Sequence, residues 1–301
     1  MQEPTSFFNL STDLLLPAVV STVVTVAVSF LLKWAEVWRS ADVSYRFEQK
    51  RKIKEALGKY HGVLLDTAEK MDGRLENLSG NYDKEWLVVG HPSSNSGYYF
   101  VSTVQRLMCF YEVVYKIERE AVALDARNAD SSDFEFLNFV AVFRWILSDV
   151  EGLFKGLSYD RTSEYDHLYA DSLKEICARF AKLADRDRQS AEMHWFLDNP
   201  HNAALLNLIS GLKPSEGRRR WDRFVALHLF LACFQDMFGH KRHQRSIERF
   251  RLIASRIESP IVLRNMISII SSYALSDCAS GQKLIRALEL EYRSKTGAYI
   301  S

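Results

Sequence analysis

An uncharged run from Leu14 to Leu32 constrains this chain more than any other feature. A helix rises about 1.5 Å per residue, so the run extends roughly 28 Å, close to the thickness of a bilayer's hydrocarbon core. A cleaved signal peptide would need basic residues before the apolar run and a small-residue cleavage site after it, and the sequence has neither. The sequence therefore predicts a transmembrane anchor that stays in the mature protein.

The charges that flank the run predict its orientation. Glu3 and Asp13 precede it without any Lys or Arg, whereas Trp34 and Trp38, which suit the headgroup region, follow it among many basic residues. These basic residues are Lys33, Arg39, Arg46, Lys50, Arg51, Lys52 and Lys54. We expect a single-pass protein of the inner membrane, with the N-terminus outside, the C-terminal domain in the cytoplasm and the lipid bilayer as a partner.

The apolar run also has a patterned face. Ser21, Thr25 and Ser29 recur at four-residue spacing and form a small, weakly polar stripe that lets helix backbones approach closely in lipid. This stripe predicts self-association in the membrane and hence a homo-oligomer. In the alternative, the Ser and Thr hydroxyls bond back to carbonyls of their own helix.

Composition and periodicity predict an all-α protein. Of the 301 residues 47% are hydrophobic, including 18 Phe and 13 Tyr, so the part after the anchor has enough apolar side chains to fold. The apolar positions follow a helical period nearly throughout. We expect four segments: a tail and anchor over 1–33, a long juxtamembrane helix over 34–78, a loop over 79–97 and a cytoplasmic helical bundle over 98–301.

Details of this pattern lead to further expectations. The long helix either packs on its own domain or coils against a partner, Trp86–Val89 is a candidate short strand, and Phe224–Phe234 is apolar but too short and basic-flanked to span a membrane. Helices are expected at 101–115, 136–147, 164–184, 190–197, 203–212, 217–238, 244–257, 261–276 and 283–293.

Several chemistries are excluded by sequence. The net charge is only +1, so it does not indicate a nucleic-acid partner, and the four Cys are dispersed singly, without the spacing of a zinc site. No phosphate-binding glycine loop, nucleophile elbow or zincin motif occurs. Glu164 and His167 at helical spacing are better explained as a solvated helix face than as metal ligands. We therefore expect no cofactor and no metal, and a function other than catalysis, with a metal-independent RNase as the alternative.

One enzyme alternative stays open. Arg and His separated by four to six residues resemble the signature of HEPN-type ribonucleases, all-helical proteins that cleave RNA without metal. Arg161/His167, Arg188/His194 and Arg223/His228 have this spacing, and Arg223/His228 lies on a strong predicted helix beside further arginines. This resemblance implies a membrane-tethered RNase with Arg223 and His228 as catalytic residues.

A second basic feature lies on a later predicted helix. Arg242, Arg245, Arg249 and Arg256 share one face of it, opposite Ile and Phe side chains. Such a face predicts a basic surface for anionic lipid or phosphate. In the alternative, which we favour, the arginines pair with acidic neighbours.

The middle of the chain carries a family resemblance. Tyr98-Tyr99-Phe100, Leu107, Arg144, Leu147-Ser148, Glu151, Phe154 and Gly156-Leu157-Ser158 resemble the motif pattern of the phage abortive-infection family over about 98–183. That family is bacterial, helical and membrane-anchored. The resemblance implies a phage-defence or stress-response component that acts through a protein partner at the inner membrane.

Overall fold

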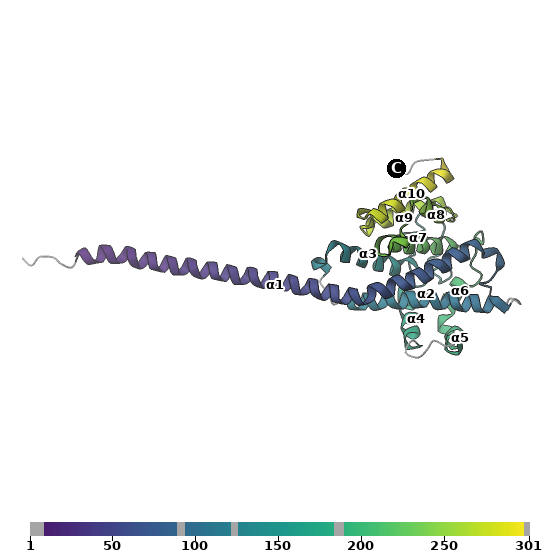
Figure 1. Ribbon diagram of the computed structural model, residues 1–301, viewed down its shortest axis with the longest axis horizontal. Helices are drawn as coiled ribbons and strands as arrows, with labels where there is room; N and C mark the ends of the chain where they lie inside the picture. Colours follow the sequence, from purple (N-terminus) through teal and green to yellow (C-terminus); the bar gives the residue numbers. More distant parts are fainter. Residues whose placement is uncertain (1–8, 89–93, 122–125, 184–189, 298–301) are drawn as a thin grey trace, which may run out of the picture. The chain divides into compact units, whose positions relative to one another are not determined.

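The computed structural model describes residues 9–88, 94–121, 126–183 and 190–297, and all regular elements in these ranges are helical (Figure 1). The all-α expectation is confirmed for them. The α-helices are α1 (Asn9–Gly80), α2 (Ser94–Ala121), α3 (Ser131–Ile146), α4 (Ala170–Leu183), α5 (Ser190–Asp198), α6 (Ala203–Ile209), α7 (Arg220–Phe238), α8 (Ile247–Ala254), α9 (Pro260–Ser272) and α10 (Ala279–Thr296). The 3-10 turns are η1 (Tyr82–Lys84), η2 (Ala126–Asn128), η3 (Pro200–Asn202), η4 (Lys241–His243) and η5 (Leu275–Asp277).

The chain divides into two compact units, residues 1–52 and 53–301. In the first unit, the α1 side chains that the structure describes, from Val19 to Lys52, are exposed except for a half-exposed Gln49. Within the described residues, α1 is the one helix long and apolar enough to cross a membrane. Trp34 and Trp38 pack edge to face, with ring centroids 5.7 Å apart.

The second unit uses the remainder of α1 as a core helix. Its buried apolar side chains recur at helical spacing along one face: Ile53, Leu57, Leu64, Ala68, Met71, Leu75 and Leu78. The long predicted helix therefore packs on its own domain over this stretch, which is one of the two expected arrangements.

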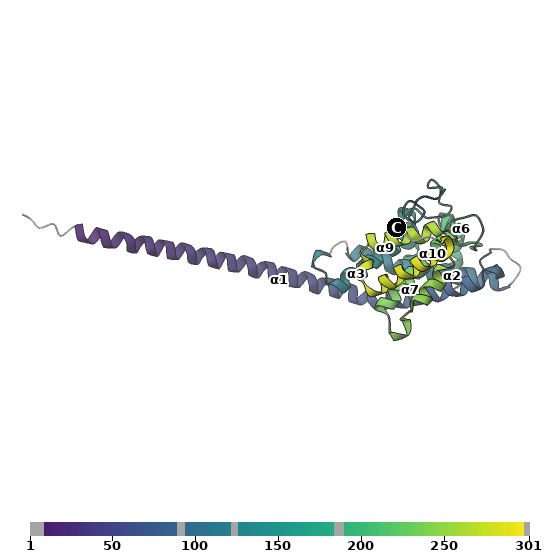
Figure 2. The ribbon, with the colours of Figure 1, turned by 90° about the horizontal axis from the view of Figure 1, so that it is seen from above.

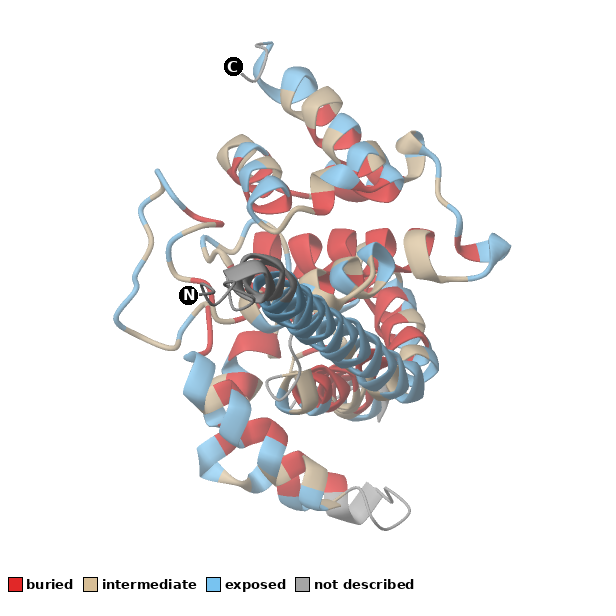
Figure 3. Cartoon of the chain, turned by 90° about the vertical axis from the view of Figure 1, so that its left-hand side faces the viewer, coloured by how far each residue is buried: buried red, intermediate tan, exposed pale blue. Residues whose placement is uncertain are grey.

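Helix α7 is the centre of this unit. Every residue from Arg220 to Asp236 is buried, and α7 packs against α3, α8 and α10, while α2 contacts α3 and α4 (Figures 1 and 2). Phe139 and Phe143 of α3 contact the ring of Phe234 at a centroid distance of 5.6 Å each. Buried residues line the inner faces of the surrounding helices (Figure 3). Phe224–Phe234 thus belongs to the protein core, as expected.

Two sequence-based expectations are wrong. Trp86 and Leu87 form a turn after η1 instead of the start of a strand, and Val89 lies outside the described residues. Glu164 and His167 are not on a helix, because α4 begins only at Ala170. Their segment is an irregular loop that α7 arginines hold, as described below.

Candidate functional site

An open cleft of about 820 Å³ lies between the segment after α3 and the end of α9. Its lining residues are Trp145, Ser148, Asp149, Val150, Glu151, Gly152, Lys155, Arg161, Ile269, Ser272 and Tyr273. Trp145 and Tyr273 face each other with ring centroids 6.2 Å apart and form an aromatic wall. The cleft combines apolar surface with charged side chains at its edge.

The segment that lines the cleft is fixed by two buried polar side chains. The Asp149 carboxylate accepts hydrogen bonds from the backbone N–H groups of Gly152, at 2.8 Å, and Leu153, at 2.7 Å. The Asn265 amide of α9 donates to the carbonyls of Leu153, at 3.0 Å, and Lys155, at 2.9 Å. These bonds satisfy an irregular backbone that would otherwise be costly to bury.

Gly152 completes this arrangement by its small size. A Cβ at this position would lie 2.8 Å from Cζ2 of Trp145, so a larger residue would displace the aromatic wall. The cleft wall therefore depends on a glycine, an Asp turn and an Asn side chain from another helix.

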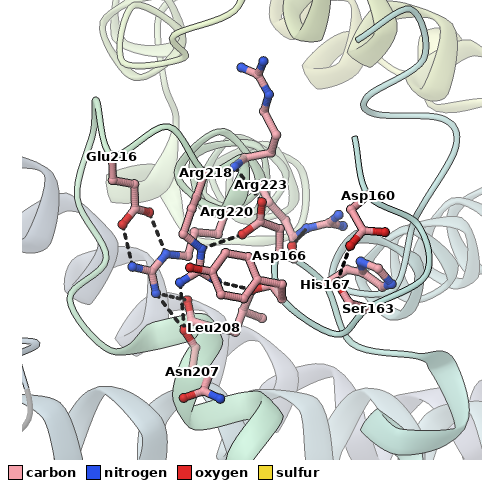
Figure 4. A network of polar contacts seen from close by, with 12 residues as sticks. Asp160, Ser163, Asp166, His167, Asn207, Leu208, Glu216, Arg218, Arg220 and Arg223 are labelled. Carbon is pink, nitrogen blue, oxygen red and sulfur yellow. Dashed lines mark hydrogen bonds and ion pairs between the residues drawn. The ribbon is translucent and has the colours of Figure 1, made fainter. Parts of the chain in front are cut away.

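Behind the segment lies Arg223 of α7, which is fully buried (Figure 4). Its guanidinium donates to the carbonyls of Ile146 at 2.6 Å, Asp149 at 2.8 Å and Asp166 at 2.7 Å. A fourth bond, 2.7 Å long, goes to the Tyr159 hydroxyl. Arg223 thus joins the end of α3 to the irregular loop through the rigid fork of its N–H donors.

The Tyr159 hydroxyl continues this network to His167. It accepts from Arg223 and forms a second hydrogen bond, 2.8 Å long, with His167 Nδ1. Burial lowers the pKa of His167, with a smaller contribution from the Arg223 charge. The lowered pKa favours the neutral imidazole, so His167 serves the loop as a hydrogen-bond partner of Tyr159.

Arg218, which lies just before α7, and Arg220, the first residue of α7, are also bound internally (Figure 4). Arg218 pairs with Asp166 at 2.7 Å, which places the loop that contains His167 against α7. Arg220 pairs with Glu216 and donates to the carbonyl of Asn207 at 2.7 Å. These side chains hold loops in place within the domain.

The predicted pair Arg223 and His228 does not form a common site. Arg223 binds backbone carbonyls of the loop, whereas the His228 ring, only 1% exposed, lies 3.2 Å from Asp72 of α1. Five residues along a helix correspond to a rotation of about 140°, so the two side chains point in different directions. The geometry therefore gives no support to the RNase alternative. The pair Arg188/His194 includes Arg188, which is outside the described residues.

The four predicted surface arginines pair with an acidic face of α1. Arg242 pairs with Glu69 at 3.1 Å and Arg245 with Asp72 at 2.6 Å. Glu76 receives both Arg249, at 3.1 Å, and Arg256, at 2.8 Å. Arg245 and Arg256 are only 14% and 19% exposed, so they are not surface cations. Of the two interpretations of these arginines, the structure shows pairing with acidic neighbours.

Two carboxyl groups near these helices have shifted pKa values. Hydrogen bonds from Arg256 lower the pKa of Glu76 to about 2. Burial raises the pKa of Asp222 to about 6, although Asp222 accepts backbone bonds from Glu258 at 2.6 Å and Ser259 at 3.2 Å. Both groups join segments that are distant in sequence.

Other predicted residues have local partners. Thr25 donates to the carbonyl of Ser21 at 2.8 Å, which is the back-bonding expected as the alternative to helix association. The Ser148 hydroxyl bonds to the Trp145 carbonyl, whereas Glu151 pairs with Arg161, so Ser148 and Glu151 do not bond to each other. Among the described residues no cluster of His, Cys, Asp and Glu could hold a metal ion.

Comparisons with known protein families, with curated proteins and with solved structures find no match to this chain.

Proposed function

We propose that this protein is a single-pass inner-membrane protein whose cytoplasmic helical domain binds a protein partner in phage defence or a related stress response. The observation that carries the proposal is that one helix, α1, contains both the predicted anchor and part of the domain core. The helix contains the uncharged run and, from Ile53 onward, supplies core side chains of the domain. Because the anchor helix continues into the domain core, folding of the domain holds it at the membrane. The basic residues that follow the apolar run favour an N-terminus on the outside.

The cleft supports partner binding as the activity of the domain. Its wall combines Trp145 and Tyr273 with a backbone segment fixed by Asp149 and Asn265, and Lys155 and Arg161 also line it. Aromatic anchors surrounded by charged residues are typical of protein recognition sites. Ser148 and Glu151, which carry part of the abortive-infection resemblance, line the same cleft. This coincidence supports the proposed defence role and the proposed partner site.

Deletion of residues 1–33 tests the tether. The truncated domain keeps every core residue, since the described core begins at Ile53, so circular dichroism should show a folded helical protein. We expect it to be soluble and to give no protection in a phage-challenge assay. Full protection by the soluble fragment would contradict the proposal. A chimera that carries an unrelated nineteen-residue apolar span should restore protection if only anchoring matters.

Substitutions in the cleft test the partner site. Tyr273→Ala removes half of the aromatic wall and should abolish protection while the protein remains in the membrane fraction. Trp195→Ala is the matched control, because Trp195 is 59% exposed and lies outside the cleft. Equal protection by both variants would rule out the cleft as the active surface.

The double variant Thr25→Leu with Ser29→Leu tests self-association. In membranes, a cross-linking reagent that does not form disulfides should link fewer copies of this variant than of the wild type. Unchanged cross-linking would show that these hydroxyls serve only their own helix.

A further inference from the structure

A second cavity, of about 260 Å³, lies between α2 and α4 and shares no lining residue with the cleft. Its lining residues are Glu112, Tyr115, Lys116, Glu118, Arg119, Lys174, Cys177, Ala178 and Ala181. We infer that this cavity binds a small anion with an apolar body, of the arylalkyl carboxylate class. The inference is independent of the proposed membrane and defence role.

Tyr115, which lines the cavity, has a buried hydroxyl without a hydrogen-bond partner among the described residues. The residue is only 7% exposed. Burial raises the pKa of Tyr115 far above its ordinary value, so the hydroxyl keeps its proton. A buried hydroxyl without a partner is unfavourable, and a ligand oxygen next to it would accept its hydrogen bond.

The wall from α4 is small and apolar. Cys177 lines the cavity and is 3% exposed, and burial raises its thiol pKa, so the thiol is neutral. Ala178 and Ala181 complete this wall with single methyl groups. The cavity is somewhat smaller than the roughly 300–1,000 Å³ of sites for drug-sized ligands, so it fits a compact apolar body.

The charges around the cavity favour an anion. Lys116 pairs with Glu112 at 2.7 Å, and Arg144 pairs with Glu118, so both lining carboxylates have cationic partners. No described carboxylate forms an ion pair with Arg119 or Lys174, and both side chains are exposed. A ligand carboxylate in the cavity would form ion pairs with these two cations.

The test is isothermal titration calorimetry on the full chain in detergent, with 4-phenylbutyrate as the probe. The neutral 4-phenylbutanol and the cationic 4-phenylbutylamine have the same apolar body. We expect saturable binding in the order carboxylate, alcohol, amine. Detergent partitioning is the same for all variants and therefore cancels in their comparison.

Four variants locate the site. Ala178→Trp fills the cavity and should weaken 4-phenylbutyrate at least tenfold. Tyr115→Phe removes only the hydroxyl and should weaken it about two- to tenfold, as expected for one hydrogen bond. Lys174→Glu should invert the preference between carboxylate and amine. Lys182→Glu changes the same charge on an exposed position of α4 outside the cavity and should change nothing.

The inference is overturned if 4-phenylbutyrate shows no saturable binding up to millimolar concentration. It is equally overturned if Ala178→Trp and Tyr115→Phe both bind like the wild type, or if Lys182→Glu weakens binding as much as Lys174→Glu. None of these outcomes uses protection or localisation, so failure here is separate from failure of the proposed function.

Discussion

Arg256 and Glu76 form a two-point ion pair, with Nη1 to Oε2 at 2.8 Å and Nη2 to Oε1 at 3.0 Å, although 180 residues separate them. The pair joins the segment after α8 to α1. Parallel N–H to carboxylate bonds of this kind are stronger and more directional than single contacts. The domain therefore closes around α1 through polar as well as apolar contacts.

A double-mutant cycle measures this pair. We expect Glu76→Ala and Arg256→Ala to show a coupling free energy of about 1–3 kcal/mol in urea unfolding, because both groups are partly buried. The control cycle uses Asp42 and Arg46, a pair that is 55% and 65% exposed and should couple by only about 0.3–0.5 kcal/mol. Equal coupling in the two cycles would contradict a role for the Arg256 pair in closing the domain.

Arg223 should be essential for folding and not for catalysis. Arg223→Met leaves the carbonyls of Ile146, Asp149 and Asp166 without their donor, so we expect a loss of at least about 3 kcal/mol in the free energy of unfolding. Arg161→Met is the control, since Arg161 is 51% exposed and should change stability by less than about 0.5 kcal/mol.

The same variant separates the two functional hypotheses. A folded Arg223→Met protein with wild-type stability that had lost RNA cleavage would revive the RNase alternative and refute the structural role of Arg223.

Asp222 should make stability depend on pH. Its pKa rises from 3.8 to about 6 on folding, so the folded state holds the proton more tightly than the unfolded state. The resulting stabilisation is complete below about pH 4 and disappears as the pH rises through about 6. Two pKa units correspond to at most about 3 kcal/mol. Asp222→Asn removes this titration, so the stability of wild type relative to the variant should fall between pH 4 and pH 7. A constant difference would show that the pKa of Asp222 is unshifted.

The four cysteines should react at different rates. Cys177, Cys233 and Cys278 are buried, and burial raises the pKa of each thiol, whereas Cys109 is half-exposed. Thiolate is the reactive form, so a thiol reagent should modify Cys109 first. When the reaction with a chromogenic thiol reagent is followed by absorbance, Cys109→Ser should remove the fast phase. A fast phase that survives this substitution would place another cysteine at the surface.

The helices were predictable because apolar periodicity reports burial directly. The stripe from Ile53 to Leu78 and the strongly apolar Phe224–Phe234 both lie in the core, as their patterns indicate. The loop around His167 was not predictable, since the spacing of Glu164 and His167 imitates a helix. Its conformation depends on Arg218 and Arg223, which lie more than fifty residues later and compete with local helix formation.

The candidate sites show the same limit. The sequence showed the shared face of Arg242, Arg245, Arg249 and Arg256, but their acidic partners on α1 are distant in sequence and no local pattern links them. Sequence reasoning also missed Asn265, a single polar residue on an apolar helix, and Asp149, whose place before Gly152 is a signal for a turn. A buried polar residue on an apolar face is the signal that could have found Asn265.

The continuity of α1 limits where the chain can be cut by a protease or joined to another chain. A cut that releases the domain intact must fall before Ile53, because any later cut removes buried side chains of α1. An exchange of membrane segments between related chains must likewise be joined upstream of this residue. The core therefore begins only 21 residues after Leu32, the last residue of the apolar run.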